Sequence, residues 1–564
     1  MKIKPIAAAL LTLTSLSSIA ATYSITPLPV SDKAKSTFAN SIDNSGTMLV
    51  TTSNEYNPPI DIERLEQTNF FTANESTIES EEDIKNGIFS DVDYTLIVFY
   101  LTSQNAFTLK KQNIAQYNSY STDLVEANLI PGFDNYVEKF QNYSKSVNTI
   151  ARDSVEGNFI VGYSQSPFED IEYTDESGEV VTYTVNDTYR RAFVQVGSET
   201  TALLPEDTLA NGISEAYAVN NIFQAAGYSS TLFSDEVRSS VKKCSDDETR
   251  SDLPEEVCIY NLVTSDTYKN NASKRATIWQ LTANGEVVAR ETFPLTFEPE
   301  NNKFAWENRI LDINNNGIAV GWSHTGEAVS ILYPESQVKS FILETDATYF
   351  ANGETKSFLT DKQDISSRSV AINDAGWITG TVFRAPNEIA RERFFIHNIE
   401  TNETHYPEGF FVNAGVIPLS INNNNVVVGK ADIEASNERN RETHAFMYNI
   451  DADNFVDLNQ LTSCDTNYTL VEAVDINDNN EIIANARMRA NDTYFTGNDL
   501  KDEDGNKVAI DKIVAVKLTP IENGQVESCE AKEEQKYERA GASNTLISLL
   551  GLSALFVLRR RKPF

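Results

Sequence analysis

A short pattern that recurs along the chain constrains its fold more than any other feature. Its clearest copy, residues 311–323, reads Leu-Asp-Ile-Asn-Asn-Asn-Gly-Ile-Ala-Val-Gly-Trp-Ser. Leu311 and Ile313 are two apart, so on a strand they face the same side. The Asn run and Gly317 favour a tight turn, because Asn tolerates the left-handed backbone and Gly adopts it freely. The apolar residues that follow predict a return strand, and Gly321 inside it is typical of close approach by another chain segment.

The pattern occurs seven times, which predicts a repeat architecture. The copies centre on Ile42, Val155, Val219, Ile313, Ile372, Ile421 and Ile476. Six are followed by a third apolar stretch, at 191–194, 275–279, 327–332, 393–396, 444–447 and 514–518. Such a unit cannot bury its apolar face alone, so it must stack on its neighbours.

The predicted fold is all-β, a β-propeller-like array of seven blades with irregular insertions. The unequal spacing of the copies disfavours a regular β-solenoid without excluding it, and a sandwich array is a third alternative. In a closed propeller an N-terminal strand often completes the last blade. We therefore expect Tyr23 to Thr26 to lie beside the 512–518 strand.

The repeat also carries a family resemblance. The pattern Ile-Asn-Asp-x-Gly-x-Ile-x-Gly, followed by His-Ala-Phe at 444–446, resembles the HAF-type extracellular repeats of bacteria, and Asp457-Leu-Asn-Gln-Leu461 also fits them. With its two ends, the chain resembles the DUF3466 family of exported gammaproteobacterial proteins. The resemblance covers roughly residues 22–520 and fits worst at 52–150. It implies no catalytic residues.

The two ends predict export and membrane contact. Residues 1–21 are typical of a signal peptide, to be removed by signal peptidase. A charged tether at 531–544 precedes an apolar segment, 545–558, and the basic cluster Arg559-Arg-Arg-Lys562 within the tail 545–564. This tail resembles the GlyGly-CTERM signal read by rhombosortase-type proteases, with Ala542 in place of the second Gly. The alternative is a simple C-terminal membrane anchor. Both indicate the envelope or surface of a Gram-negative cell.

Between these ends, residues 22–530 are expected to form the repeat domain. Two stretches, about 52–150 and 228–274, do not fit the repeat and are interpreted as insertions. The run Asp93 to Leu101 is strongly apolar. We interpret it as a buried strand, a candidate for the third strand of the first unit.

Four cysteines in an exported chain predict two disulfides. Cys244 and Cys258 flank one acidic loop, so a local pair is favoured; Cys464 and Cys529 would then tie the last repeat to the segment after it. Three pairings are formally possible. No Cys-x-x-Cys spacing suggests a metal site.

The net charge of the chain limits the classes of partner that it can bind. Asp and Glu outnumber Lys and Arg by 82 to 46, for a net charge of −36. That argues against nucleic acid, which requires basic patches. Calcium is the one cofactor considered, with Asp502, Asp504 and Asp511 as candidate ligands, although an EF-hand frame would place Leu500 first. The simpler interpretation is an Asp-Gly hairpin turn.

Catalytic motifs are missing from the sequence. The four histidines have no paired metal spacing. His444 belongs to the repeat and is expected to be structural, and His324 is interpreted as a surface residue. The leading hypothesis is an envelope-associated protein that binds a ligand or partner, or is structural. The alternatives are an extracellular polysaccharide hydrolase or lyase, and a calcium-dependent adhesion module. Two carboxylates with a Tyr or Arg at the ring's centre would favour the enzyme, and Asn, Ser and Thr there would oppose it.

Overall fold

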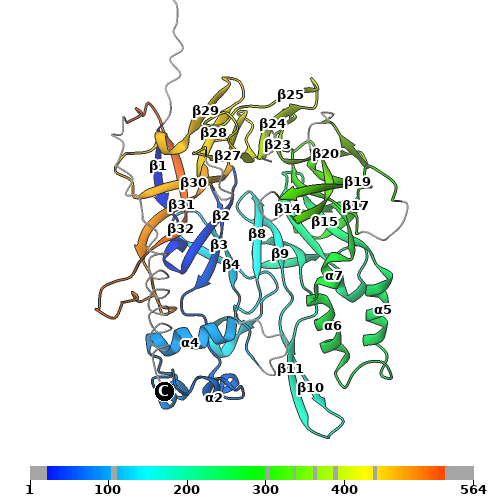
Figure 1. Cartoon of the computed structure of the whole chain (residues 1–564), viewed down its shortest axis with the longest axis vertical. Helices are drawn as coiled ribbons and strands as arrows, with labels where there is room; N and C mark the ends of the chain where they lie inside the picture. The colour runs from blue at the N-terminus through cyan, green and yellow to red at the C-terminus, as the bar shows by residue number, and fades with distance from the viewer. Residues whose placement is uncertain are drawn as a thin grey trace, which may run out of the picture. The chain divides into compact units, whose positions relative to one another are not determined.

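The computed structural model describes residues 22–102, 111–299, 305–333, 338–359, 365–384, 391–435 and 441–527, with the backbone alone at 329–333 and 338–342. These residues form seven four-stranded antiparallel sheets in the arrangement of a seven-bladed β-propeller (Figure 1). The first strands of successive blades contact one another all the way round, from blade 7 back to blade 1. The predicted fold class is confirmed.

The first three blades follow the chain in order. Blade 1 is β2 (Ala34–Ile42), β3 (Met48–Glu55), β4 (Tyr117–Thr122) and β5 (Ala127–Ile130). Blade 2 is β8 (Thr149–Val155), β9 (Phe159–Ser164), β12 (Arg191–Val196) and β13 (Glu199–Leu203). Blade 3 is β14 (Ser214–Val219), β15 (Gln224–Phe233), β16 (Ala272–Leu281) and β17 (Val287–Thr292).

The next three blades continue the pattern. Blade 4 is β18 (Asn308–Ile313), β19 (Ala319–Tyr333), β20 (Val338–Ala351) and β21 (Glu354–Ser357). Blade 5 is β22 (Ser366–Ile372), β23 (Trp377–Arg384), β24 (Arg391–Asn398) and β25 (Glu403–His405). Blade 6 is β26 (Val416–Ile421), β27 (Val426–Asp432), β28 (Thr443–Asn449) and β29 (Asn454–Asp457). The centre of every sequence repeat is the last residue of a first strand.

Blade 7 joins the two ends of the propeller. It contains β30 (Tyr468–Ile476), β31 (Ile482–Asn491), β32 (Ala509–Ile521) and, from the start of the chain, β1 (Thr22–Pro27). Tyr23 pairs with Pro520 and Ile25 with Leu518. The predicted closure by the N-terminal strand is confirmed, and it holds the ring shut with backbone hydrogen bonds between segments almost 500 residues apart.

A bulge in each first strand explains the strand glycine of the repeat. The pairing of first and second strands shifts register once in blades 1 to 6, as between Ile310 and Asp312, and twice in blade 7. A Cβ on Gly321 would lie 1.9 Å from the carbonyl oxygen of Arg309. The equivalent glycines of blades 2, 3, 5 and 6 are equally close to the backbone opposite: Gly162, Gly227, Gly380 and Gly429. The predicted close approach is therefore real, and a bulged backbone causes it.

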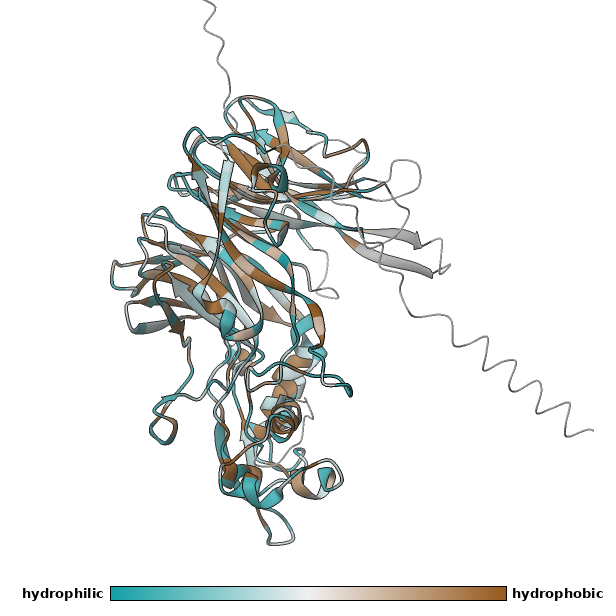
Figure 2. Cartoon of the chain, turned by 90° about the vertical axis from the view of Figure 1, so that its left-hand side faces the viewer, coloured by the Kyte–Doolittle hydropathy of each residue, from teal (hydrophilic) through white to brown (hydrophobic). Residues whose placement is uncertain are grey.

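The hydrophobic core lies between the blades. One cluster joins Ala226 and Ile278 of blade 3 to Ile313 and Phe350 of blade 4, and similar clusters join other neighbours. Apolar residues accordingly concentrate along the strands and polar residues in the links (Figure 2). Each blade buries its face only against the next one.

Two predictions about strands were wrong. Asp93 to Leu101 belongs to helix α4 (Asp91–Thr102), and β4 is the third strand of blade 1. The buried Tyr94, Ile97, Val98 and Leu101 have helical spacing. Ile97 and Leu101 pack within the insertion, and Tyr94 and Val98 pack against Phe495 of the loop between β31 and β32. In blade 4, residues 327–332 extend the second strand β19, and β20 is the third.

Three insertions interrupt blades 1, 2 and 3 at the same place, between the second and third strands. The first holds α1 (Ile62–Leu65), α2 (Phe70–Asn74), α3 (Glu81–Lys85) and α4. The second is the hairpin β10 (Glu169–Thr174) and β11 (Val180–Val185). The third holds α5 (Asp235–Cys244), α6 (Glu255–Thr264) and α7 (Asp266–Asn270). All three lie below the blades in Figure 1.

Short elements complete the described chain. They are the hairpin β6 (Tyr136–Val137) and β7 (Asn142–Tyr143) and the 3-10 turns η1 (Pro29–Asp32), η2 (Glu138–Phe140), η3 (Leu209–Asn211) and η5 (Leu458–Leu461).

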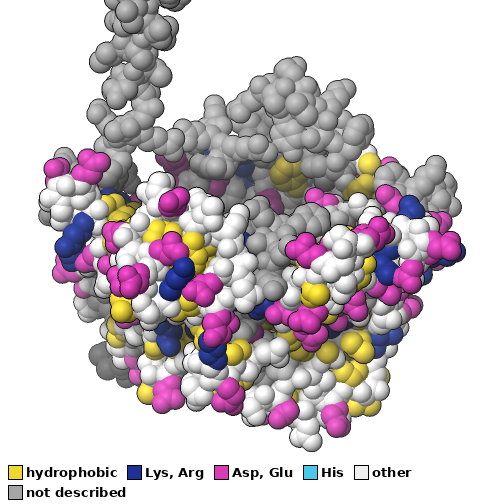
Figure 3. Space-filling model, turned by 90° about the horizontal axis from the view of Figure 1, so that it is seen from below, with side chains coloured by type: hydrophobic (Ala, Val, Ile, Leu, Met, Phe, Trp, Pro, Cys, Tyr) yellow, Lys and Arg dark blue, Asp and Glu magenta, His cyan; other side chains and the backbone are white. Residues whose placement is uncertain are grey.

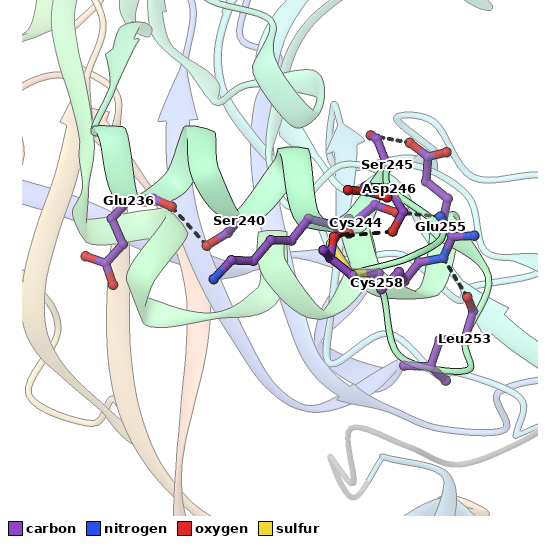
Figure 4. Close-up of a disulfide and its surroundings, with 11 residues drawn as sticks. Glu236, Ser240, Cys244, Ser245, Asp246, Leu253, Glu255 and Cys258 are labelled. Carbon is purple, nitrogen blue, oxygen red and sulfur yellow. Dashed lines mark hydrogen bonds between the residues drawn. A yellow bond between two sulfur atoms is a disulfide. The ribbon is translucent and has the colours of Figure 1, made fainter.

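A disulfide fixes the third insertion. Cys244, at the end of α5, is bonded to Cys258 in α6 (Figure 4). The loop between them is held further by Arg250, whose guanidinium donates to the carbonyl oxygens of Cys244 and Leu253 at 2.6 and 2.8 Å. The predicted partner of Cys464 is Cys529, which lies outside the described residues, so that pairing stays a prediction.

The surface is acidic without being segregated. Asp and Glu side chains are scattered over the face in Figure 3, with Lys and Arg among them. No helix among the described residues is long and apolar enough to cross a membrane. The predicted signal peptide (1–21), tether (531–544) and apolar tail (545–564) lie outside the described residues.

Candidate functional site: the central opening and the insertion cleft

The propeller presents two different faces. In an antiparallel blade the chain reverses at every link, so successive links alternate between the two ends of the ring. The repeat turns, which join first to second strands, lie at one end, which we call the turn face. The three insertions, which join second to third strands, lie at the other, which we call the insertion face. Each face has a cavity.

The first Asn of the repeat builds the wall of the central opening on the turn face. This opening has a volume of about 690 Å³ and is lined by turns from every described blade. The buried Asn314 side chain accepts the N–H groups of Asn316 and Ile318 at 3.1 and 3.0 Å, which holds its own turn. Its amide donates to the carbonyl oxygen of Asn373 in the next blade at 3.0 Å. The same bond, from a side-chain amide to a backbone carbonyl oxygen of the next blade, joins Asn220 to Asn314, Asn373 to Asn422, Asn422 to Asn477 and Asn477 to Asp43.

The second residue of each turn forms a parallel series of bonds. The N–H of Asn315 donates to the Asp374 carboxylate at 2.8 Å, and the N–H of Asp374 donates to the Asn423 side chain at 2.9 Å. The series continues from Asn221 to Asn315, Asn423 to Asp478 and Asp478 to Asn44. The polar turn groups are thus bonded mostly to one another, from blade 3 round to blade 1.

These bonds correct the sequence interpretation of the Asn run. The run was attributed to left-handed turn backbone, but only its fourth position has a positive φ, as at Gly317 (75°), Asn425 (58°) and Asn480 (57°). The first two Asn positions serve instead as connectors between blades. No pattern within one repeat reveals this, because the partner belongs to another.

Three carboxylates line the opening below the turns. Asp153, Asp312 and Asp475 each accept the backbone N–H of the following blade at 2.8 Å, from Val219, Ile372 and Ile42. Burial raises the pKa of all three, with repulsion from other carboxylates of the ring as a smaller contribution, and it raises the pKa of Asp312 to about 6. They connect blades, and burial favours the protonated form of each carboxyl group.

A cluster of charged and aromatic side chains lies further along the first strands. Arg190 pairs with the buried Glu215 at 2.5 Å, and the hydroxyl of Tyr217 also donates to Glu215. Arg309 pairs with Glu307 at 2.9 Å and lies 4.4 Å from the centre of the Tyr228 ring. Further cation–π contacts join Arg190 to Tyr163, Arg152 to Tyr217, and both Arg309 and Arg368 to Trp322.

This cluster has the composition expected of an enzyme site, but its carboxyl pKa values are shifted away from those that suit a general acid. Burial disfavours the Glu215 carboxylate, yet Arg190 and hydrogen bonds from tyrosines outweigh it and hold its pKa below the usual range. Arg309 and Lys274 similarly outweigh burial at Glu307 and lower its pKa. Burial raises the pKa of Tyr217. A general acid needs a raised carboxyl pKa and a tyrosine base a lowered one, and both are shifted the wrong way.

The second cavity is a cleft among the insertions, on the insertion face. It has a volume of about 540 Å³ and is bordered by the end of α4, residues 111–116, β11, α6 and α7. Contacts between α6 and β11 hold two of its walls together. The walls come from the insertions of blades 1, 2 and 3, which occupy equivalent links of adjacent blades. The cleft therefore exists only because the propeller brings them together.

The cleft presents unused polar groups and aromatic rings. Tyr183, Tyr189 and Tyr260 line it, and their hydroxyls have no hydrogen-bond partner among the described residues. Lys269 lies 4.2 Å from the centre of the Tyr189 ring. Lys111 also lines it, and burial lowers the pKa of this lysine to about 8. None of the described residues that line the cleft is acidic.

Two of the candidate calcium ligands, Asp502 and Asp504, lie in the loop between β31 and β32, and the third, Asp511, lies in β32. Asp502 accepts the N–H groups of Asp504 and Asn506 at 3.0 and 2.8 Å, as expected for a hairpin turn. Asp511 pairs with Arg489 at 3.2 Å. Within the described ranges, no three His, Cys, Asp or Glu residues gather in a way that could hold a metal ion.

The histidines have structural surroundings. The His444 ring lies 2.7 Å from the Asp457 carboxylate, so the His-Ala-Phe and Asp-Leu-Asn segments of the repeat meet in one blade. The surface position predicted for His324 was wrong. It is buried between Trp306 and Trp322, accepts the N–H of Glu307 at 2.9 Å, and burial lowers its pKa to about 4.

Comparison with known proteins identifies the family. The chain matches the family described as "Protein of unknown function (DUF3466)" over residues 1–561. It belongs to the DUF3466 family. No curated protein matches it. The likeness to HAF-type repeats and to GlyGly-CTERM tails stays a prediction.

Solved structures are similar only at low levels. An acylaminoacyl peptidase from Pyrococcus horikoshii is 10% identical, with a TM-score of 0.36, over 81% of this chain and 50% of that one. The propeller domain of the Trilobed protease from Pyrococcus furiosus is 8% identical, with a TM-score of 0.30, over 66% and 83%. An oligogalacturonate lyase from Vibrio parahaemolyticus is 10% identical, with a TM-score of 0.28, over 66% and 97%. This DUF3466 protein spans about half the length of the peptidase, and none of these likenesses carries an argument about function.

Proposed function

We propose that this DUF3466 protein is a non-enzymatic binding protein of the cell envelope, and that its ligand occupies the insertion cleft. The observation that carries the proposal is the contrast between the two cavities. Polar groups around the central opening are bonded to one another, whereas three tyrosine hydroxyls in the cleft have no partner among the described residues. A group that water already satisfies can exchange that water for a ligand.

The location follows the sequence. The segment 1–21 directs export, and the tail 545–558 engages the membrane, either as an anchor or until a rhombosortase-type protease cuts near Gly541 and Ala542. The propeller is then displayed outside the cytoplasm. A disulfide in the third insertion suits such an oxidising compartment.

A ligand panel tests the proposal with the full chain. Oligosaccharides, peptides and small metabolites are screened for a shift in melting temperature, and each hit is assayed for chemical products. We expect hits that raise the melting temperature and no product. Asn261→Trp, which fills the cleft from α6, should abolish the shift, while Lys242→Trp on the exposed side of α5 should preserve it.

Two results would overturn the proposal. One is product formation that disappears in Glu215→Gln, which would make the central cluster an enzyme site. The other is a ligand whose shift survives Asn261→Trp, which would place binding outside the cleft.

A further inference from the structure

The insertion cleft also indicates a class of ligand. We propose that it binds an acidic carbohydrate, an oligosaccharide that carries carboxylate or sulfate groups. This inference rests on the cleft being the binding site proposed above, and it concerns only which chemistry the cleft selects.

The first observation is the sign of the charge. The chain has 82 acidic residues against 46 basic ones, so most of its surface repels anions. The cleft is an exception, because its described lining residues include Lys111 and Lys269 and no Asp or Glu. An anion that enters the cleft meets two lysines and no carboxylate among the described lining residues.

The second observation is where the two cations come from. Lys111 follows the first insertion, and its ammonium lies 4.8 Å from the centre of the Tyr100 ring. Lys269 belongs to α7 of the third insertion and lies 4.2 Å from the centre of the Tyr189 ring. Lys269 forms no ion pair among the described residues. Two lysines from different insertions can contact anionic groups on separate units of one chain.

The third observation favours a sugar over an inorganic anion as the ligand. Phe168, Tyr183, Tyr189 and Tyr260 line the cleft, and aromatic faces pack against the C–H faces of sugar rings. Tyrosine hydroxyls and the side chains of Gln116 and Asn261 supply donors and acceptors for sugar hydroxyls.

The size of the cleft agrees with this ligand. Its volume, about 540 Å³, falls within the roughly 300–1,000 Å³ typical of ligand pockets. A phosphate or sulfate ion would leave most of that space and all of the aromatic lining unused.

The test compares matched oligosaccharides by calorimetric titration of the full chain. A short uronic-acid oligosaccharide should bind, and a neutral glucan of the same length should bind at least tenfold more weakly. The acidic ligand's affinity should fall as salt rises. Lys269→Gln should weaken acidic binding roughly tenfold, the loss of one charge-assisted contact, and leave any neutral binding unchanged. Lys243→Gln, an exposed lysine of α5, is the matched control and should have no effect.

The outcomes separate the two proposals. If both oligosaccharides bind equally and Asn261→Trp abolishes their binding, the preference for an acidic ligand is overturned and the cleft remains the binding site. Competition by inorganic sulfate at the oligosaccharide's own concentration would overturn the proposal that the ligand is a carbohydrate. Tighter binding of a single-stranded oligonucleotide would overturn it as well. Binding of neither oligosaccharide would overturn this inference, while another ligand from the panel would keep the proposed function. Because Lys269 packs on Tyr189, the variant's melting temperature is measured first, and the salt dependence of the unmodified chain gives an independent reading.

Discussion

The turn face bonds its polar side chains across blades, whereas the cleft on the insertion face combines bonded side chains with tyrosine hydroxyls that no described residue bonds. On the turn face, Asn314 forms three hydrogen bonds within the protein, two inside its own turn and one to the next blade. On the insertion face, Tyr183 and Tyr260 line a cleft with hydroxyls that no described residue bonds. A cavity lined by polar groups is therefore not by itself a binding site: what matters is whether those groups already have partners.

The two faces also differ in how regularly they are built: the turns repeat from blade to blade, and the insertions do not. The turn face repeats one device around the ring, so its residues serve stability. The insertions differ in each of three blades, and only one of them has a disulfide, between Cys244 and Cys258. We infer that the repeats build the scaffold and the insertions give it specificity.

The largest effect should come from removing one of the connecting asparagines. Asn314→Ala deletes the bonds to Asn316, Ile318 and the buried Asn373, a loss of about 3 kcal/mol in the free energy of unfolding. The matched cleft variant Asn261→Ala should change stability by less than about 0.5 kcal/mol. Urea denaturation measures both. Equal losses would mean that the cleft is as structural as the turn face.

Loss of the disulfide should affect the insertion face alone. The bond closes a loop with a sequence separation of 14, for which chain entropy predicts about 3 kcal/mol. In Cys244→Ser with Cys258→Ser, we expect hydrogen exchange to increase in α5 and α6 while the strands of the ring keep their protection. Loss of protection in β14 or β18 as well would show that the ring depends on this insertion.

The smallest effect should be a change in pH dependence at the turn face. Burial, with repulsion from Asp475 and Asp374, raises the folded pKa of Asp312 to about 6 from 3.8. Between these two pKa values the folded protein keeps a proton that the unfolded chain releases. The stabilisation that Asp312 gives the folded state is therefore complete below about pH 4 and is lost as pH rises through about 6. Asp312→Asn keeps an oxygen for Ile372 and does not ionise. The variant's free energy of unfolding should exceed that of the unmodified protein by about 1 kcal/mol near neutral pH and should equal it at low pH. The gain is no larger because Asp312 is partly exposed to the opening.

Denaturation curves at several pH values check that expectation. Asp502→Asn is the control, because Asp502 is an exposed turn residue whose pKa is lowered by N–H donors. A stability gain for Asp312→Asn that is the same at every pH would contradict the proposed protonation.

Much of the fold could be predicted from the sequence because it repeats. Ile313 and its equivalents mark the end of every first strand, and Tyr23 to Thr26 were correctly expected in the last blade. The insertions were harder. Asp93 to Leu101 is apolar enough for either a buried strand or a helix, and only its neighbours in the insertion select the helix.

The candidate site was less predictable for a related reason. The sequence named neither Tyr260 nor Lys269 as a site residue. These residues belong to no motif, and their signal is the absence of acidic neighbours in space, which the order of residues along the chain does not contain.

By itself, the sequence determined the number of blades, the hairpin at the start of each and the closure by the N-terminal strand, because these depend on local patterns and on counting. Only the tertiary structure decided what the polar residues do. Asn314 finds its partner in the next repeat, and the cleft forms between segments from three blades. Hydrogen bonds and cavities depend on distances between segments far apart in the chain, and folding sets those distances.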